Sequence, residues 1–196
     1  MKREAKILET KKTIEGRRTI RKYQQTAIPR EVLKELVNAA RLAPSAANMQ
    51  PLEYVVVDEE PLKEELFKTL KWAGYIKDGA PESDERPAAY IVILIRKERK
   101  TTYSGHDSGA AAENMMLLAH DQGIGSCWLG SVDREKAREI LAVPEDCTID
   151  TVIALGYRGE KSEVYDSDET VKYERKNGKY RVPKRPLEKI IHWNNG

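Results

Sequence analysis

The sequence predicts an α+β domain built around one long buried helix, and three observations support this fold class. Residues 107–121 are apolar nearly all round, as expected of a helix surrounded by protein. Residues 88–95 and 148–155 are continuous apolar runs of the kind found in buried strands. A chain of 196 residues is long enough to bury a sizeable core. We therefore expect residues 1–196 to form a single domain.

Two helices are predicted before the first strand. Residues 3–15 alternate charged and apolar side chains and indicate an amphipathic helix. Pro29 suits the first turn of a second helix, in which apolar residues recur at helical spacing as far as Ala40. The polar turn 43–51 ends this helix, because the residue before a proline is biased away from the helical conformation. Residues 52–57 then indicate a strand.

Further helices and loops are predicted in the second half of the chain. We expect helices over residues 61–70 and 133–141, the second with an aspartate cap. Residues 71–86 indicate a loop, and residues 160–185 are a polar stretch with three tyrosines. A short helix over residues 187–192 is expected near the end.

The buried helix has signals at both of its ends. Asp107 or Ser108 can cap its start, and Gly123 stands where a left-handed residue would end it. The next stretch, residues 123–130, contains three glycines beside the large ring of Trp128. Because glycine lets another group approach the backbone closely, we expect this loop to lie against something flat.

The charge balance excludes some classes of protein. The chain carries 34 Lys and Arg against 32 Asp and Glu, a formal net charge of +2. A dedicated nucleic-acid-binding protein usually has a clear basic excess. No apolar run approaches the roughly 18 residues of a membrane span, and the N-terminus lacks the apolar core of a signal peptide. Because two cysteines make no disulfide framework, we expect a cytoplasmic protein.

Three basic or polar clusters are candidates for binding an anion. They are Arg17, Arg18 and Arg21; residues 45–50; and Lys184 with Arg185. Arginine binds phosphate through a two-pronged fork, and lysine adds a point charge. Two basic clusters from opposite ends of the chain could meet around one phosphate. In the alternative interpretation each cluster is solvated surface charge, and residues 45–50 are an ordinary loop.

The sequence indicates neither a metal site nor a catalytic nucleophile. The histidines His106, His120 and His192 have no ligand spacing. Cys127 is interpreted as a small buried apolar residue rather than as a nucleophile. The chain also lacks a G-K-[ST] phosphate loop and the Rossmann glycine pattern. A place for a flat phosphorylated group, without an obvious acid or base, suits an enzyme whose chemistry belongs to a cofactor.

Five segments, taken in order, resemble motifs of the FMN-dependent nitroreductase family. They are residues 17–21 (RRTIR), 43–51 (APSAANMQP), 107–116 (DSGAAAENMM), 125–130 (GSCWLG) and 183–193 (PKRPLEKIIHW). Each motif alone is weak, but together in this order they are a strong signal. The resemblance covers residues 14–193. It implies a mixed or antiparallel sheet flanked by helices, in an intertwined homodimer around the buried helix.

The resemblance also implies that FMN is bound in the dimer interface by residues of both subunits. Arg17, Arg18, Thr19 and Arg21 would bind the phosphate, the ribityl chain and the pyrimidine edge, and Lys184 and Arg185 would complete the phosphate site. The partner subunit would contribute Pro44, Ser45, Ala46 and Asn48, and Gln50 is also expected to bind the cofactor. Backbone at Trp128, Leu129 and Gly130 would face the flavin ring. If residues 17–21 are helical, Arg17 and Arg21 share one helix face.

The implied activity is hydride transfer from NAD(P)H, through flavin N5, to a small acceptor such as a nitroaromatic or a quinone. Two alternatives stay open: other flavin chemistry on the same fold, such as reductive dehalogenation or oxygen-dependent flavin breakdown, and a non-catalytic FMN storage or sensing protein. Three positions depart from the family pattern. They are Thr19 for Ser, Leu52-Glu53 for Trp-Arg, and the acidic loop 72–86. The last two leave the acceptor open, and the sequence does not indicate a choice between NADH and NADPH.

Overall fold

One antiparallel sheet of four strands forms the centre of the computed structural model, which describes residues 2–77 and 79–194. Its order is β1 (Leu52–Val57), β2 (Ala89–Arg96), β4 (Cys147–Tyr157) and β3 (Ile124–Leu129). The predicted strands 52–57, 88–95 and 148–155 are confirmed. The fourth was expected as an open loop, and this expectation was wrong because residues 124–129 pair along their whole length with β4.

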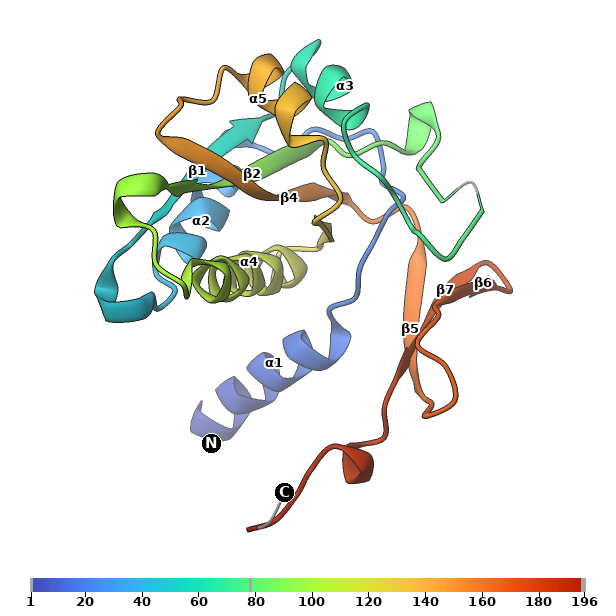
Figure 1. Cartoon of the computed structure of the whole chain (residues 1–196). Helices are drawn as coiled ribbons and strands as arrows, with labels where there is room; N and C mark the ends of the chain where they lie inside the picture. The colour runs from blue at the N-terminus through green and yellow to red at the C-terminus, as the bar shows by residue number, and fades with distance from the viewer. Residues whose placement is uncertain (1, 78, 195–196) are drawn as a thin grey trace.

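Helices cover both faces of this sheet (Figure 1). On one face lie α2 (Arg30–Arg41) and α4 (Ser104–Asp121), and on the other lie α3 (Leu62–Phe67) and α5 (Arg134–Leu141). Each face has its own apolar core, and β2 contributes alternate side chains to both. This confirms the α+β class. The predicted α2 and α5 are also confirmed, and Asp133 caps α5 by accepting the N–H of Lys136.

The central helix α4 begins earlier than predicted and has no side-chain cap. Its N-cap residue is Tyr103, so the expected caps at Asp107 and Ser108 are wrong. Asp107 instead accepts the backbone N–H of Ala46, and Ser108 donates to Asp150. The left-handed Gly123, with φ +78°, is confirmed.

The chain leaves one side of α4 partly uncovered. Ala111, Ala112 and Met115 are fully buried against the sheet. On the opposite side Glu113 and Leu117 are only half-buried, and Asn114 is exposed. This side of α4 therefore carries both polar and apolar residues and is only partly covered by the chain itself.

The segment after α1 (Lys2–Gly16) is extended, so the conditional expectation of a helix over residues 17–21 is wrong. The segment crosses the ends of β3 and β4, with bridges from Thr19 to Ser126 and from Tyr23 to Arg158. Two facing glycines make room for it. A Cβ on Gly125 would lie 2.8 Å from Ile20, and one on Gly156 would lie 2.8 Å from Tyr23. Gly125 therefore admits the protein's own chain, not a flat ligand.

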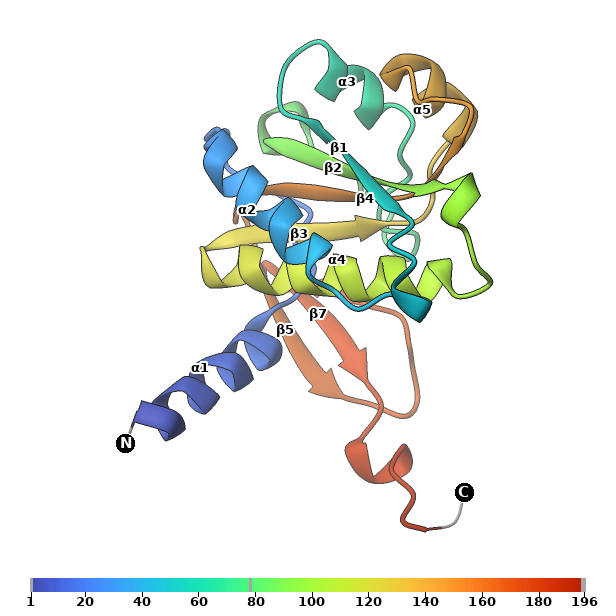
Figure 2. The same ribbon diagram turned by 90° about the vertical axis from the view of Figure 1, so that its left-hand side faces the viewer.

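A second, smaller sheet follows β4 and stands apart from the main body (Figure 2). Its order is β5 (Lys161–Asp166), β7 (Lys179–Lys184) and β6 (Glu174–Lys176), with β5 and β7 parallel. The sequence did not predict it, because its side chains are mostly exposed and polar and show no apolar alternation. Only Tyr180 is fully buried among its tyrosines.

Three smaller predictions have mixed outcomes. The helix α1 is confirmed, whereas α3 is shorter than the predicted 61–70 because Leu70 turns away to pair with Val132. The expected last helix is only a 3-10 turn, Leu187–Lys189. In the described part of the chain, no helix combines the length and apolar character that a bilayer crossing needs.

Candidate functional site

Three of the predicted cofactor-binding residues lie together along α4 and β3. The Nε atom of Arg17 donates to Glu113 Oε1 of α4 at 3.2 Å. One turn earlier on the same helix face is Gly109, where an added Cβ would lie 3.6 Å from the ring of Trp128. Thr19 bridges Ser126, two residues before Trp128 on β3. Trp128 is 44% exposed, so this face is open to a ligand or a partner.

The outer edge of β3 presents backbone groups on the same face. The carbonyl of Ser126 accepts the N–H of Ile20 at 2.9 Å and therefore points away from β4. Because the direction of backbone groups alternates along a strand, the N–H of Trp128 points to the same outer edge. Leu129 is different, since its side chain is buried in the core and its carbonyl accepts the hydroxyl of Thr151 at 2.7 Å. Gly130 is exposed at the end of the strand.

Arg21 points into the space between the two sheets. Its guanidinium carbon lies 4.8 Å from the centre of the Tyr173 ring and 4.9 Å from that of Tyr180. Its backbone N–H donates to Glu160 at 2.7 Å. Within this single chain, Arg21 therefore lies between the tyrosines that follow β4 and Cys127 of β3.

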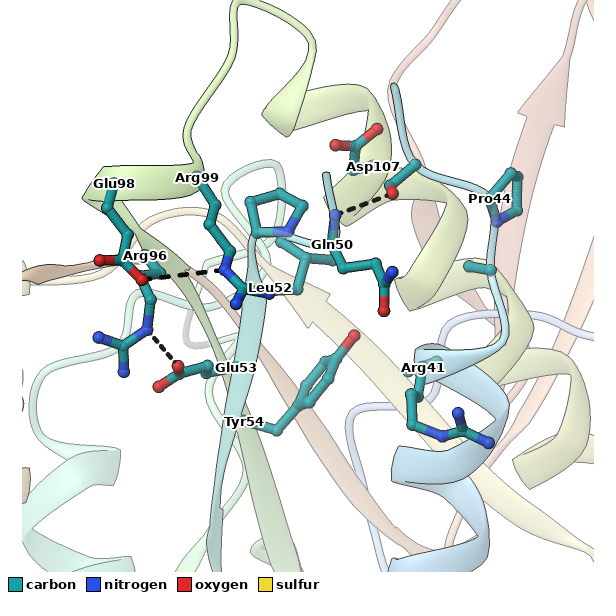
Figure 3. Close-up of a pocket in the computed structure, with 14 residues that line it drawn as sticks. Arg41, Pro44, Gln50, Leu52, Glu53, Tyr54, Arg96, Glu98, Arg99 and Asp107 are labelled. Atoms are coloured by element: carbon teal, nitrogen blue, oxygen red, sulfur yellow. Dashed lines mark hydrogen bonds and ion pairs between the residues drawn. The ribbon is translucent and has the colours of Figure 1, made fainter. Parts of the chain in front are cut away.

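The loop with Pro44, Ser45, Ala46, Asn48 and Gln50 borders a separate cavity of about 290 Å³ at the first turn of α4. Figure 3 shows the side chains of Gln50 and Tyr54 pointing into this space, with Asp107 beside it. Asp107 is 5% exposed: Oδ1 accepts the N–H of Ala46 at 2.9 Å, and Oδ2 has no hydrogen-bond partner in the described structure. Burial raises the pKa of Tyr54 to about 12, so its hydroxyl stays protonated.

The same loop is held in a strained conformation. Ala47, Asn48 and Gln50 all have positive φ, at 50°, 54° and 48°. Non-glycine residues seldom adopt this region, and such strain persists only where the surroundings impose it. The bond from Ala46 to Asp107 and the 3.1 Å bond from the Gln50 N–H to Ser45 Oγ are two of these constraints.

The C-terminal basic pair lies away from the other cationic residues. Arg18 lines the same groove as Lys179, at the start of β7, whereas Lys184 ends that strand. Six strand residues span about 17–20 Å. Arg185 contacts Asp168 at 3.3 Å and the carbonyl of Lys189. One chain therefore does not bring Lys184 and Arg185 beside Arg18.

Several residues that sequence reasoning missed support this arrangement. Glu113 orients Arg17, Asp107 holds the strained loop, and Arg158 donates to His120 Nδ1 at 2.5 Å. Asp107 and Glu113 both lie in the 107–116 motif, but Asp107 was interpreted as a helix cap and Glu113 was given no role. Burial, then the charge of Arg158, lowers the pKa of His120, so its ring is neutral near pH 7. Burial raises the pKa of Cys127 to about 11, which makes it a poor nucleophile.

A protein-family model described as "Nitroreductase family" matches residues 14–157, most of the chain. The chain belongs to the nitroreductase family. The match includes the segments of Arg17, Ala46 and Trp128, and it ends where β4 ends. The second sheet lies beyond the matched residues.

Relatives and solved structures agree with this family membership. A relative from Archaeoglobus fulgidus, provisionally named NADH dehydrogenase/NAD(P)H nitroreductase, is 33% identical over 81% of this chain and 90% of its own. A Thermus thermophilus NADH dehydrogenase is 24% identical over 95% and 97%. The structure of an FMN-dependent nitroreductase from Clostridium difficile has a TM-score of 0.71 and 26% identity, covering 94% of this chain and 98% of that one. These likenesses confirm the fold expected from the resemblance.

Proposed function

We propose that this nitroreductase-family protein is an FMN-dependent oxidoreductase that works as a homodimer and takes electrons from NAD(P)H. The observation that carries the proposal is the alignment of Arg17, Thr19 and Trp128 along one partly uncovered face of α4 and β3. An anion-binding arginine, a hydroxyl and a free edge N–H in that order suit a long flat molecule with a phosphate at one end. The names of the relatives support the same conclusion.

The residues of this face fit FMN in three respects. Arg17 is half-buried and fixed by Glu113, so it would meet the phosphate with little loss of side-chain freedom. The exposed Trp128 side chain leaves space on the outer side of β3. The backbone N–H of Trp128 would donate to a nitrogen of the flavin ring. Bound FMN would supply the redox chemistry between NAD(P)H and an oxidised acceptor.

The partner subunit would complete the site through the strained loop. In one chain this loop and Arg17 lie on different parts of α4: Ala46 contacts Asp107 in the first turn, and Arg17 contacts Glu113. A homodimer would place the loop of one subunit over the Arg17 face of the other. The protein's own groups would then bind and orient FMN and exclude water. A nitroaromatic, a quinone or an enone remains the proposed acceptor.

The decisive test is the purified protein itself. We expect a yellow protein that releases about one FMN per chain on denaturation, and that oxidises NADH or NADPH when a nitroaromatic or a quinone is present. Arg17→Ala should weaken FMN binding, by about tenfold for the loss of one charged hydrogen bond, whereas Lys11→Ala on exposed α1 should not. A protein that neither contains nor takes up FMN would refute the proposal. FMN without NAD(P)H turnover would leave the storage or sensing alternative.

A further inference from the structure

A cationic groove lies where α1 ends beside the second sheet. It encloses about 490 Å³ and is bordered by Arg18, Arg158, Lys161, Lys179, Glu160 and Glu163. Arg158 and Lys161 follow residue 157, at which the family match stops. The second sheet is therefore what turns the end of β4 into a groove. Arg18 is one of the residues that the family resemblance implies for FMN, but Arg158 and Lys161 are not.

The two carboxylates of the groove are already engaged. Glu160 accepts the N–H of Arg21 at 2.7 Å and pairs with Arg175 at 3.3 Å. Glu163 pairs with Lys179 at 2.9 Å and with Arg181 at 3.1 Å. Both carboxylates therefore form their ion pairs with residues of the second sheet. These pairs do not include Arg18, Arg158 or Lys161.

Arg18 and Arg158 are held by neutral acceptors instead of carboxylates. Arg18 donates to the backbone carbonyls of Arg17 and, at 2.6 Å, of Glu15. Arg158 donates to Nδ1 of His120 and, at 3.1 Å, to its carbonyl. Burial lowers the pKa of both arginines, and Arg17 lowers that of Arg18 further. Among the described side chains of residues 9–77 and 79–194, neither arginine forms an ion pair, nor does Lys161.

Three uncompensated cations around one groove form a site for an anion with several charged oxygens. Two guanidinium forks match tetrahedral oxygens better than point charges do, and the lysine adds mobile charge at the rim. We propose that this groove binds the phosphomonoester group of a nucleotide. A phosphomonoester is a dianion near pH 7, which two arginines and a lysine can balance, whereas each phosphate in the pyrophosphate bridge of NADH carries only one charge.

Two nucleotides of the proposed function carry such a group: FMN at its 5′ end, and NADPH on its adenosine ribose. Naming FMN or NADPH as the ligand rests on the proposed function. The binding of a phosphate group by the groove does not depend on it. Inorganic phosphate therefore gives a test that needs neither flavin nor turnover. His120 contacts Arg158 and is also near Arg17 and Arg18, with Asp121 as the nearby carboxylate, so its imidazole reports on charge in the groove.

The first measurement is an NMR titration of the histidine rings with inorganic phosphate in the purified protein. Phosphate should raise the pKa of His120 by roughly half a unit, because an anion offsets the nearby cations, and leave exposed His106 unchanged. Lys161→Glu should abolish the shift; Lys161 is exposed and unpaired in the described structure, so this variant should fold. Lys172→Glu, at an exposed lysine of the same segment outside the groove, is the matched control. No shift in the parent protein would overturn the proposal.

The second measurement identifies the nucleotide with Lys161→Gln and the double variant Lys161→Gln/Arg158→Gln. About a tenfold loss of FMN affinity in the double variant, with riboflavin affinity unchanged, assigns the groove to the FMN phosphate. About a tenfold rise in the KM for NADPH, with the KM for NADH unchanged, assigns it to NADPH. If the variants match Lys172→Gln in both measurements, the groove binds neither nucleotide and the proposal is wrong. If neither the parent protein nor any variant binds flavin, the proposed function is refuted. The phosphate titration would still test the groove in that case.

Discussion

Arg21 lies over the Tyr180 ring, with its guanidinium carbon 4.9 Å from the ring centre. Tyr180 is fully buried, and Tyr173 flanks the same guanidinium at 4.8 Å. Both tyrosines belong to the segment beyond residue 157, where the family match ends. In this chain an arginine of a family motif is therefore bound by a part of the chain that the family model does not include.

Arg21→Ala should destabilise the fold rather than change the reduction potential of the bound flavin. Removing a partly desolvated cation–π contact should lower the free energy of unfolding by about 1–2 kcal/mol, measured by urea denaturation. Arg21→Lys keeps the charge and should recover part of the loss. The reduction potential of bound FMN should stay that of the parent protein. A lower potential in Arg21→Ala would instead place this residue at the pyrimidine edge, as the family resemblance implies.

Asp107→Ala should release the strained loop. The Ala46 N–H would lose its partner, at a cost of about 1–3 kcal/mol, and the positive φ values of Ala47 and Asn48 would lose one of their constraints. We expect faster amide exchange at Ala46 and weaker FMN binding. Asp107→Asn keeps an acceptor oxygen and should retain most of the amide protection at Ala46 and most of the FMN affinity. Unchanged exchange at Ala46 in the alanine variant would show that Asp107 does not hold the loop.

The protein should lose stability at acid pH through His120. Its pKa lies below the usual 6.5 because of burial and the charges of Arg158, Arg17 and Arg18. The unfolded chain therefore binds a proton more readily as the pH falls below about 6.5, and stability decreases through that window. His120→Gln should flatten the fall in urea midpoint between pH 7 and pH 5, and His106→Gln should not. Equal slopes in parent and His120→Gln would exclude this effect.

Neither cysteine should be needed for turnover. Burial raises the pKa of Cys127 to about 11 and also raises that of Cys147, so both thiols stay protonated at neutral pH. We expect no reaction with a thiol reagent in the native protein and full reaction of both after denaturation. Cys127→Ala should keep its activity at the cost of about 1 kcal/mol of stability from lost packing. Loss of most activity in a variant that still binds FMN would contradict this.

The C-terminal arm should stabilise a homodimer. After β7 the chain runs away from the body (Figure 1) with Leu187 61%, Ile190 52% and Trp193 78% exposed. Large exposed apolar side chains of this kind mark an interaction surface. Deleting residues 187–196 should shift the sedimentation coefficient toward the monomer, whereas Glu188→Gln/Lys189→Gln in the same arm should not. A stable, flavin-loaded monomer of the parent chain would refute the dimer.

Local patterns in the sequence determined the main elements of this protein. The apolar runs 88–95 and 148–155 became β2 and β4, and the spacing in α2 and the cap at Asp133 became helices where expected. Hydrophobic burial is decided largely by the residues of each segment and their period. For the same reason the sequence alone indicated the fold class, and its ordered motifs indicated the family.

Only the tertiary structure decided which charges meet. Whether residues 17–21 form a helix or an edge segment depended on Gly125 and Gly156, which lie far away in sequence and leave room for Ile20 and Tyr23. The second sheet has no apolar alternation, so no local signal indicated that it would enclose Arg21. Ion pairs such as Arg17 with Glu113 join residues 96 positions apart. Such contacts are set by how whole elements pack, and electrostatic partners follow from that packing rather than from spacing along the chain.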